Sequence, residues 1–406
     1  MENPLRASVL ASQIESLLET ARQKRLRLVE GVAFIADGNS CHVFSERPPY
    51  QPAGNPVPGF FVIVEGGRLP EGLSGKLASM GADAGTPVVL VDAAGRAPVR
   101  AFVGTEPGEG FPVAVLSPEK DLASRRGALL EGSLLSERRV MIVGVGSFGS
   151  VAALELAKAG VGRFILADMD RLEPGNVSRH ACGIADVGRY KTFAVRDAIF
   201  ARNPDAEVDT LEADVNTQME YLREAGRHSD VILCLTDSAR SRFNVNAAAV
   251  SASRPALFGR AVTRAAGGDV FRYRPGGPCL SCLFSAGAAP GEEEVSSPRQ
   301  VSGAEFDYAP PGYAAGLVQP GLSNDIAPIV QMVVKLALLE LSPRTAPLWR
   351  KLDEDLEAPF YVWANRREGI YEDYPPMQYA FNRSSVMRWY GVRVPRDGAC
   401  LACGLG

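Results

Sequence analysis

Histidine is scarce in this chain of 406 residues, which contains three in all. They are scattered, and neither an HExxH motif nor any other histidine pair with metalloprotease spacing is present. Because hydrolytic zinc centres depend on such closely spaced ligands, the sequence disfavours a zinc hydrolase. The chain also lacks any run of about 18 apolar residues, so no transmembrane helix is expected.

Neither sign of charge is in large excess, since the formal net charge is −4. An electrostatic footprint for nucleic acid or anionic lipid is therefore not expected. The N-terminal sequence MENPLRASVL lacks the basic and apolar regions of a signal peptide. We expect a cytoplasmic protein without membrane contacts, whose seven cysteines are thiols or metal ligands rather than disulfides.

The chain is long enough for two domains, and its patterns predict an α/β fold for both. In residues 1–122 a helix is predicted over 6–30, followed by short strands at 31–36, 60–65, 86–92, 98–103 and 112–116. In residues 123–406 strands and helices alternate from 139 to 260, which predicts a doubly wound, mostly parallel, Rossmann-like sheet. Residues 285–323 are rich in Ala, Gly, Pro, Ser and Glu, and we expect a mobile loop there.

Two CxxC pairs, Cys279–Cys282 and Cys400–Cys403, stand in Gly- and Pro-rich surroundings. Each pair can present two thiolates from one tight turn, and two such turns complete a tetrahedral zinc site. Four sulfur ligands leave no open position, so this metal would attach the C-terminal tail to the core without catalysing a reaction. The alternative is two independent redox or inert pairs.

The segment VGVGSFGS follows an apolar run and contains Gly144, Gly146 and Gly149, with Asp168 further along the chain. This pattern predicts a strand, a tight turn and a helix whose N-terminus faces phosphates. Alone, it indicates a dinucleotide or a nucleotide equally.

Polar residues downstream distinguish these two ligands. The loop after Asp168 and the helix that follows supply Asp170, Asn176, Arg179 and Lys191. An NAD site needs one acidic residue for the ribose, whereas a triphosphate site needs cations to neutralise it. Asp237 follows a predicted strand at 230–235, at the sheet edge where Mg²⁺ could bind a carboxylate and phosphate oxygens. The set favours a nucleoside triphosphate.

From about residue 135 onward, the chain resembles the ThiF/MoeB/ubiquitin-activating-enzyme superfamily. The match comprises the glycine loop, the DxD at 168–170, the NxxR at 176–179, Lys191, the TDx₄R at 236–242, and the paired CxxC motifs. Such proteins bind ATP and Mg²⁺ and adenylate the C-terminal glycine of a ubiquitin-like or sulfur-carrier protein. The activators of bacterial ubiquitin-like conjugation systems are the preferred subfamily, which implies a ubiquitin-like protein, a conjugating enzyme and a homodimer as partners.

The resemblance also implies roles for individual residues. The nucleotide-binding set is Gly144, Gly146, Gly149, Asp168, Asp170, Asn176 and Arg242. The catalytic set is Arg179, Lys191 and Asp237, with Asp237 on Mg²⁺. Ser238 stands where the family often has Asn. For the arginine that the family takes from a partner subunit, the nearest candidates are Arg125 and Arg126.

A thioester step would need a cysteine, and residues 283–399, where related activators commonly carry it, contain none. If the CxxC thiols bind zinc, Cys41, Cys182 and Cys234 remain. Cys182 follows Arg179 by three residues, and we expect nearby cations to lower its pKa. A small packing residue is the alternative, and an activator that stops at the adenylate needs no cysteine.

Other functions stay open at this stage. Within the same family, the substrate could be a sulfur-carrier protein, a peptide or a tRNA base. Outside this family, the alternatives are an NAD(P)-dependent oxidoreductase and a non-enzymatic scaffold. Residues 1–122 could be a degenerate counterpart of the adenylation domain or a module that recruits a partner.

Overall fold

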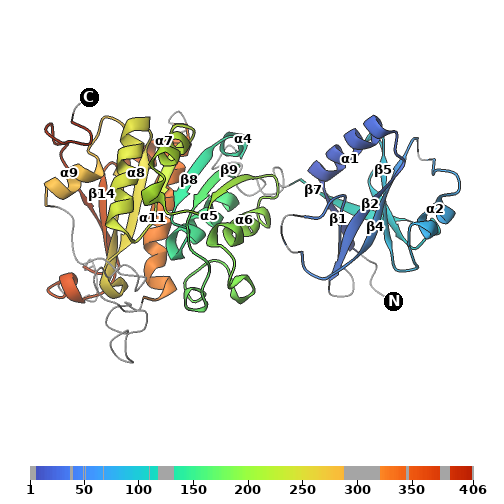
Figure 1. Ribbon diagram of the computed structural model, residues 1–406, viewed down its shortest axis with the longest axis horizontal. Helices are drawn as coiled ribbons and strands as arrows, with labels where there is room; N and C mark the ends of the chain where they lie inside the picture. Colours follow the sequence, from blue (N-terminus) through green and yellow to red (C-terminus); the bar gives the residue numbers. More distant parts are fainter. Residues whose placement is uncertain are drawn as a thin grey trace. The chain divides into compact units, whose positions relative to one another are not determined.

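The computed structural model describes residues 6–36, 40–48, 50, 52–66, 68–108, 110–117, 132–287, 321–343, 347–374 and 385–404. The chain divides into two compact units, Met1–Arg125 and Arg126–Gly406, which Figure 1 draws in blue to cyan and in green to red.

The N-terminal unit is a closed barrel with strand order β1-β3-β2-β4-β5-β6-β7. It closes because β1 pairs in parallel with both β3 and β7. Its strands are β1 (Arg6–Leu10), β2 (Leu28–Ala36), β3 (Ser40–Phe44), β4 (Asn55–Val64), β5 (Pro87–Asp92), β6 (Arg100–Val103) and β7 (Phe111–Leu116). Two helices accompany them, α1 (Ala11–Lys24) and α2 (Leu73–Ser79). The α/β character predicted for this unit is confirmed.

The helix predicted over residues 6–30 is wrong at both ends, because 6–10 form β1 and 28–30 begin β2. Four consecutive residues of β1, from Ala7 to Leu10, are buried. A strand buried on both faces has no alternation of apolar and polar residues, so its sequence cannot be told from one turn of helix. Strand β3 was not predicted either.

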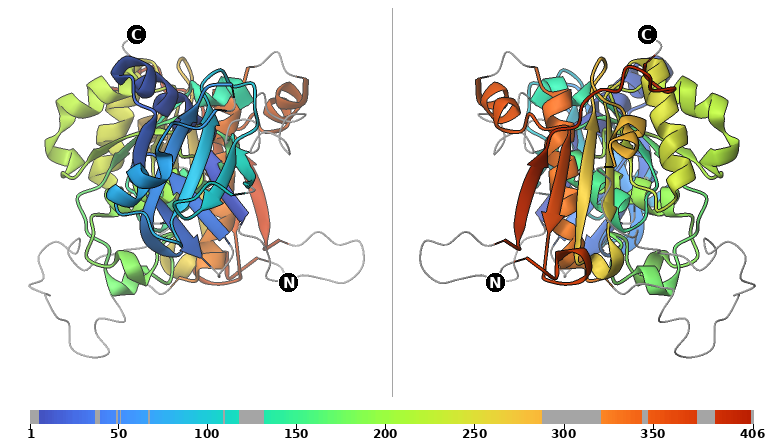
Figure 2. Two further views of the ribbon diagram at one scale, coloured as in Figure 1. Left: turned by 90° about the vertical axis from the view of Figure 1, so that its right-hand side faces the viewer. Right: turned by 90° about the vertical axis from the view of Figure 1, so that its left-hand side faces the viewer.

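The C-terminal unit is built on an eight-stranded sheet of order β10-β9-β8-β11-β12-β13-β14-β15. The first five strands in this order are parallel and the last three antiparallel. Figure 2 shows β14 and β15, in red tones, at one edge of this sheet. The strands are β8 (Arg139–Val143), β9 (Arg163–Ala167), β10 (Glu207–Leu211), β11 (Val231–Cys234), β12 (Ala256–Ala261), β13 (Gly267–Tyr273), β14 (Phe360–Ala364) and β15 (Arg388–Val392).

Helices cover both faces of the sheet (Figure 1). One core lies under α5 (Ser147–Ala159), α6 (Lys191–Phe200), α11 (Ser323–Leu341) and α12 (Pro347–Asp355). The other lies under α7 (Met219–Arg227), α8 (Ala239–Ala252) and α9 (Leu280–Ser285). A short α4 (Gly132–Ser136) precedes β8. The predicted doubly wound, mostly parallel sheet is confirmed.

Several elements of this unit were not predicted from the sequence: α4, α7, α9, α12 and β13. Of the loop predicted at 285–323, residues 288–320 lie outside the described residues. In the described part of the chain, none of the helices combines the length and the apolar character needed to cross a membrane.

Candidate functional site

A cavity of about 740 Å³ opens at the C-terminal edge of the parallel strands. From β8 the chain first crosses to β9 and β10, and it then continues on the other side of β8 through β11 and β12. The ends of β8 and β11 therefore meet at a reversal of strand order, which is where open α/β sheets bind ligands. The cavity has the size of a small-molecule site.

The three loop glycines have different surroundings. Gly144, directly after β8, has φ +85°, and a Cβ there would lie 2.8 Å from the Leu235 carbonyl oxygen. A Cβ on Gly149 would lie 1.9 Å from the Gly144 carbonyl oxygen. A Cβ on Gly146, which lines the cavity, would meet no atom within 4 Å. Gly144 and Gly149 thus allow close packing, whereas Gly146 keeps space open at the N-terminus of α5, where anions bind favourably.

Asp168 and Lys191 both line the cavity. The Asp168 carboxylate accepts the backbone N–H groups of Val145 at 2.8 Å and Asp170 at 2.9 Å. Burial raises the pKa of Asp168, against the attraction of Lys191. The Lys191 ammonium donates to Asp170 at 2.8 Å. Burial disfavours its charged form, but the charges of Asp168 and Asp170 outweigh burial and raise the pKa of Lys191, so it remains a cation.

Asp237 lies in the turn between β11 and α8, and its neighbours hold this turn in place. Ser238 caps α8 by accepting the backbone N–H of Ser241. Arg242 is buried and donates from Nε and Nη2 to the Thr236 carbonyl oxygen at 3.1 and 2.8 Å. The cavity brings together most of the predicted nucleotide-site residues: Gly144, Gly146, Asp168, Asp170, Arg179, Lys191, Asp237 and Arg242.

Two residues predicted for the nucleotide site do not line the cavity. Gly149 packs inside α5. The Asn176 side chain accepts the backbone N–H of Glu173 at 3.0 Å and closes a 3₁₀ turn. Arg125 and Arg126 lie outside the described residues.

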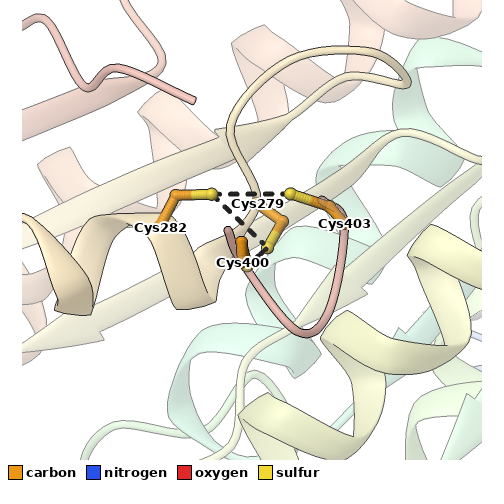
Figure 3. A group of neighbouring side chains, drawn as sticks. All are labelled: Cys279, Cys282, Cys400 and Cys403. Atoms are coloured by element: carbon orange, nitrogen blue, oxygen red, sulfur yellow. Dashed lines mark hydrogen bonds between the residues drawn. The ribbon is translucent and has the colours of Figure 1, made fainter. Parts of the chain in front are cut away.

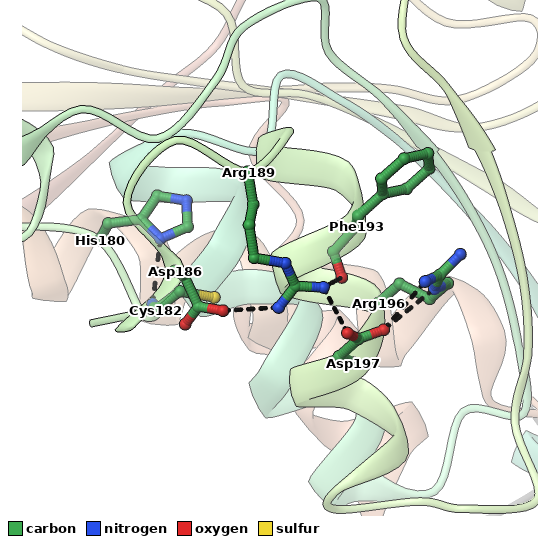
Figure 4. A network of polar contacts seen from close by, with 7 residues as sticks. All are labelled: His180, Cys182, Asp186, Arg189, Phe193, Arg196 and Asp197. Carbon is green, nitrogen blue, oxygen red and sulfur yellow. Dashed lines mark hydrogen bonds and ion pairs between the residues drawn. The ribbon is translucent and has the colours of Figure 1, made fainter. Parts of the chain in front are cut away.

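Cys182 does not line the cavity, and it is 5% exposed. Its side chain lies beside the Asp186 carboxylate (Figure 4). Burial, followed by the charge of Asp186, raises the pKa of Cys182 to about 12, although Arg189 and Arg202 act in the opposite direction. The prediction that neighbouring cations lower this pKa is wrong, because burial and the charge of Asp186 outweigh the cations.

The four CxxC cysteines converge, as predicted (Figure 3). Their sulfur atoms all lie within 4.8 Å of one another. The distances from Cys279 to Cys282 and Cys400 are 3.9 and 3.7 Å, and that from Cys282 to Cys403 is 3.5 Å. Tetrahedral zinc with Zn–S bonds of about 2.3 Å requires sulfur separations of about 3.8 Å. The donor set therefore fits a structural zinc ion.

Asn246 connects this group of cysteines to α8. It is 1% exposed, and its side chain accepts the Leu280 backbone N–H at 2.9 Å. Burial disfavours the Cys279 thiolate, but hydrogen bonds from the Cys282 N–H and the Asn246 side chain outweigh it and lower the pKa of Cys279 to about 7. Asn246 thus orients a predicted metal ligand, as residues behind such ligands commonly do.

Further polar residues line the cavity that the sequence analysis did not identify. Asp214 and Asn216 follow β10, and Arg240 lies in the first turn of α8. Their positions at the ends of strands are a signal that could have found them. Arg260 lies inside β12, where no sequence pattern distinguishes it from a core position.

Comparisons with known proteins all point to one family. The model of the ThiF family matches residues 130–343. Molybdopterin-synthase adenylyltransferase of Salmonella typhimurium is 33% identical over 178 residues, which cover 42% of this chain and 71% of that protein. The sulfur carrier protein ThiS adenylyltransferase of Escherichia coli is 33% identical over 153 residues, or 37% and 59% of the two chains.

Other similar proteins are matched over smaller shares or with lower identity. The uncharacterized protein y4oA of Sinorhizobium fredii is 33% identical over 178 residues, and the match spans 30% of its length. Among solved structures, E. coli MccB with selenomethionine MccA has a TM-score of 0.49 and 18% identity, covering 70% of this chain and 74% of that chain.

Proposed function

The chain belongs to the ThiF family and is an adenylyltransferase of that family, and we propose that it uses ATP and Mg²⁺ to adenylate the C-terminal glycine of a ubiquitin-like protein. One observation carries this proposal. A single cavity is lined by an anion-accepting helix N-terminus at Gly146, by Asp168, by the cations Arg179 and Lys191, and by Asp237.

The nucleotide lies along the strand ends in this proposal. Its phosphates occupy the space that Gly146 keeps open at the start of α5. Asp168 accepts the ribose hydroxyls, and the two backbone N–H groups bonded to its carboxylate fix its orientation. Asp237 offers a carboxylate to Mg²⁺, which prefers carboxylate and phosphate oxygens.

The reaction requires little covalent work from the protein. A carboxylate oxygen of the substrate forms a bond to the α-phosphorus, the bond to the bridging oxygen breaks, and pyrophosphate leaves with the electron pair. Arg179 and Lys191 stabilise the charge that develops on the phosphate oxygens. Lys191 suits this role because its pKa is raised and its charge is held by neighbouring acids.

We propose that the acyl adenylate passes to an external acceptor, such as the thiol of a conjugating enzyme. All seven cysteines of the chain belong to the described residues, and four of them form the proposed zinc site. The other three are buried, and burial raises the pKa of Cys41 to about 11, that of Cys182 to about 12, and that of Cys234. Buried neutral thiols are poor nucleophiles, so a thioester on this chain has no support.

The residues that line the cavity lie between Val143 and Ala261, in the C-terminal unit. We propose that the N-terminal unit recruits the ubiquitin-like protein or the conjugating enzyme, and that the enzyme acts as a homodimer.

ATP–pyrophosphate exchange tests the proposed activity. The full chain is incubated with Mg-ATP and, separately, a ubiquitin-fold protein ending in Gly-Gly, a sulfur carrier of the ThiS type, and tRNA. We expect exchange with the ubiquitin-fold protein, none with tRNA, and loss of exchange in Arg179→Ala and Asp237→Ala without loss of fold. Arg350→Ala, an exposed arginine on α12, is the control.

Each other outcome has a defined meaning. Exchange with the sulfur carrier alone would mean that the substrate is a sulfur carrier instead of a ubiquitin-like protein, while the proposed reaction would stand. Tight binding of NADH without binding of ATP would contradict the proposal and favour the oxidoreductase alternative.

A further inference from the structure

A buried ion pair closes the β12 end of the cavity and has no role in the proposed nucleotide site. Arg260 on β12 stands opposite Asp269 on β13 in the antiparallel register. Its Nε donates to both carboxylate oxygens of Asp269, at 3.0 and 2.8 Å. The two side chains are 9% and 5% exposed, and Arg260 lines the cavity.

Packing alone does not account for this pair. Phe258 and Phe271 lie two residues from Arg260 and Asp269 on the same strands, and their rings are in contact with a centroid distance of 6.2 Å. Apolar side chains at 260 and 269 would continue this aromatic contact. A buried ion pair commonly gives no more stability than an apolar pair of similar volume. A guanidinium in the cavity wall is therefore better explained by a polar ligand.

The order of the strands identifies which ligand lies at this end. Along the cavity, the strand ends follow the order β10, β9, β8, β11 and β12. The proposed function assigns the ribose to Asp168 after β9, the phosphates to the loop after β8, and Mg²⁺ to Asp237 after β11. The β12 end is thus left for the second reactant, whose carboxylate must reach the α-phosphate.

We propose that Arg260, held in place by Asp269, binds the terminal carboxylate of the protein substrate at the β12 end of the cavity. This inference rests on the proposed adenylation. The pairing with Asp269 moderates the positive charge of the guanidinium, so Arg260 orients the carboxylate without strongly reducing its nucleophilicity.

The test measures the KM for the protein substrate in pyrophosphate exchange and, separately, the Kd for Mg-ATP. Arg260→Met alone would leave the buried Asp269 carboxylate without the guanidinium opposite it and could prevent folding. The double variant Arg260→Met/Asp269→Leu removes both charges together. With a ubiquitin-fold protein ending in Gly-Gly, we expect the KM for that protein to rise at least tenfold, while the Kd for Mg-ATP stays within threefold of wild type. Arg350→Met/Glu354→Leu, an exposed pair on α12, should change neither.

The outcomes separate this inference from the proposed function. If wild type exchanges pyrophosphate and the double variant has the wild-type KM for the protein, Arg260 does not bind the substrate. If the double variant loses Mg-ATP affinity instead, Arg260 belongs to the nucleotide site and the inference is wrong. If wild type shows no exchange, the proposed function fails, and the assignment of Arg260 fails with it.

Discussion

Replacing the loop glycines one at a time should separate packing from nucleotide binding. In Gly149→Ala the new Cβ would lie 1.9 Å from the Gly144 carbonyl oxygen, so the backbone of the loop and of α5 must move apart. In Gly146→Ala the new Cβ meets no atom within 4 Å and occupies the space at the N-terminus of α5. We expect the first variant to lose stability and the second to lose affinity for ATP.

The structure gives the size of each effect. Overpacking of this kind costs about 3 kcal/mol, which lowers the Tm of a unit of this size by roughly 6–12 °C. Alanine at position 146 lowers the conformational entropy of the unfolded chain, which stabilises the fold, but it caps a helix less well than glycine, which destabilises it. The two effects nearly cancel, so stability changes by no more than about 1 kcal/mol. A methyl group among the phosphate oxygens should weaken ATP binding at least about tenfold, or about 1.4 kcal/mol.

Thermal unfolding and calorimetric titration with Mg-ATP measure the two effects separately. Gly175→Ala is the matched control, because a Cβ there also meets no atom within 4 Å and Gly175 does not line the cavity. A Gly146→Ala protein that binds ATP like wild type would refute the assignment of this loop to the phosphates. A Gly149→Ala protein with wild-type Tm would refute the packing argument.

The remaining predictions concern the cysteines and their support. Cys400→Ser should lower the zinc content measured by atomic absorption below one equivalent, and an unchanged content would contradict a four-thiolate site. Asn246→Ala removes a hydrogen bond to Cys279 and should weaken zinc binding roughly tenfold, measured by competition with a chelator, while Asn244→Ala should not. Equal affinities would exclude this support. Because the pKa of Cys182 is raised to about 12, it stays protonated at pH 8, and iodoacetamide should label it only after unfolding. Rapid labelling of the native protein would contradict its burial.

Apolar strands followed by glycine were readily predicted, because the apolar run indicates the strand and the glycine indicates where it ends. The helix predicted after the glycine loop is present as α5 (Ser147–Ala159). The convergence of the four cysteines followed from the chemistry of paired thiolates. The grouping of polar residues at one edge followed from the parallel strands, whose carboxyl ends lie together.

Strand β13 could not be predicted, because its sequence GGDVFRY combines glycines with charges that suggest a loop. Partners on other elements neutralise these charges. Asp269 pairs with Arg260 on β12, and Arg272 pairs with Asp353 on α12, which is 81 residues away. The sequence around β13 does not indicate an ion-pair partner so far along the chain.

The error at Cys182 has a similar cause. Three residues separate it from Arg179, which lines the cavity, but Cys182 packs into the core under α5 and α6. There it lies beside Asp186, and its backbone N–H is bonded to His180 at 3.0 Å. Closeness in sequence to a cation therefore did not predict that burial and an acid would determine the pKa of this thiol.

The central claim is that a substrate carboxylate attacks the α-phosphate of ATP. An oxygen-18 label in the C-terminal carboxylate of the ubiquitin-like protein tests it most directly. After incubation with the enzyme, Mg-ATP and hydroxylamine as the acyl acceptor, the account predicts that AMP carries one labelled oxygen and that pyrophosphate carries none. Unlabelled AMP, or the formation of ADP with labelled phosphate, would contradict it.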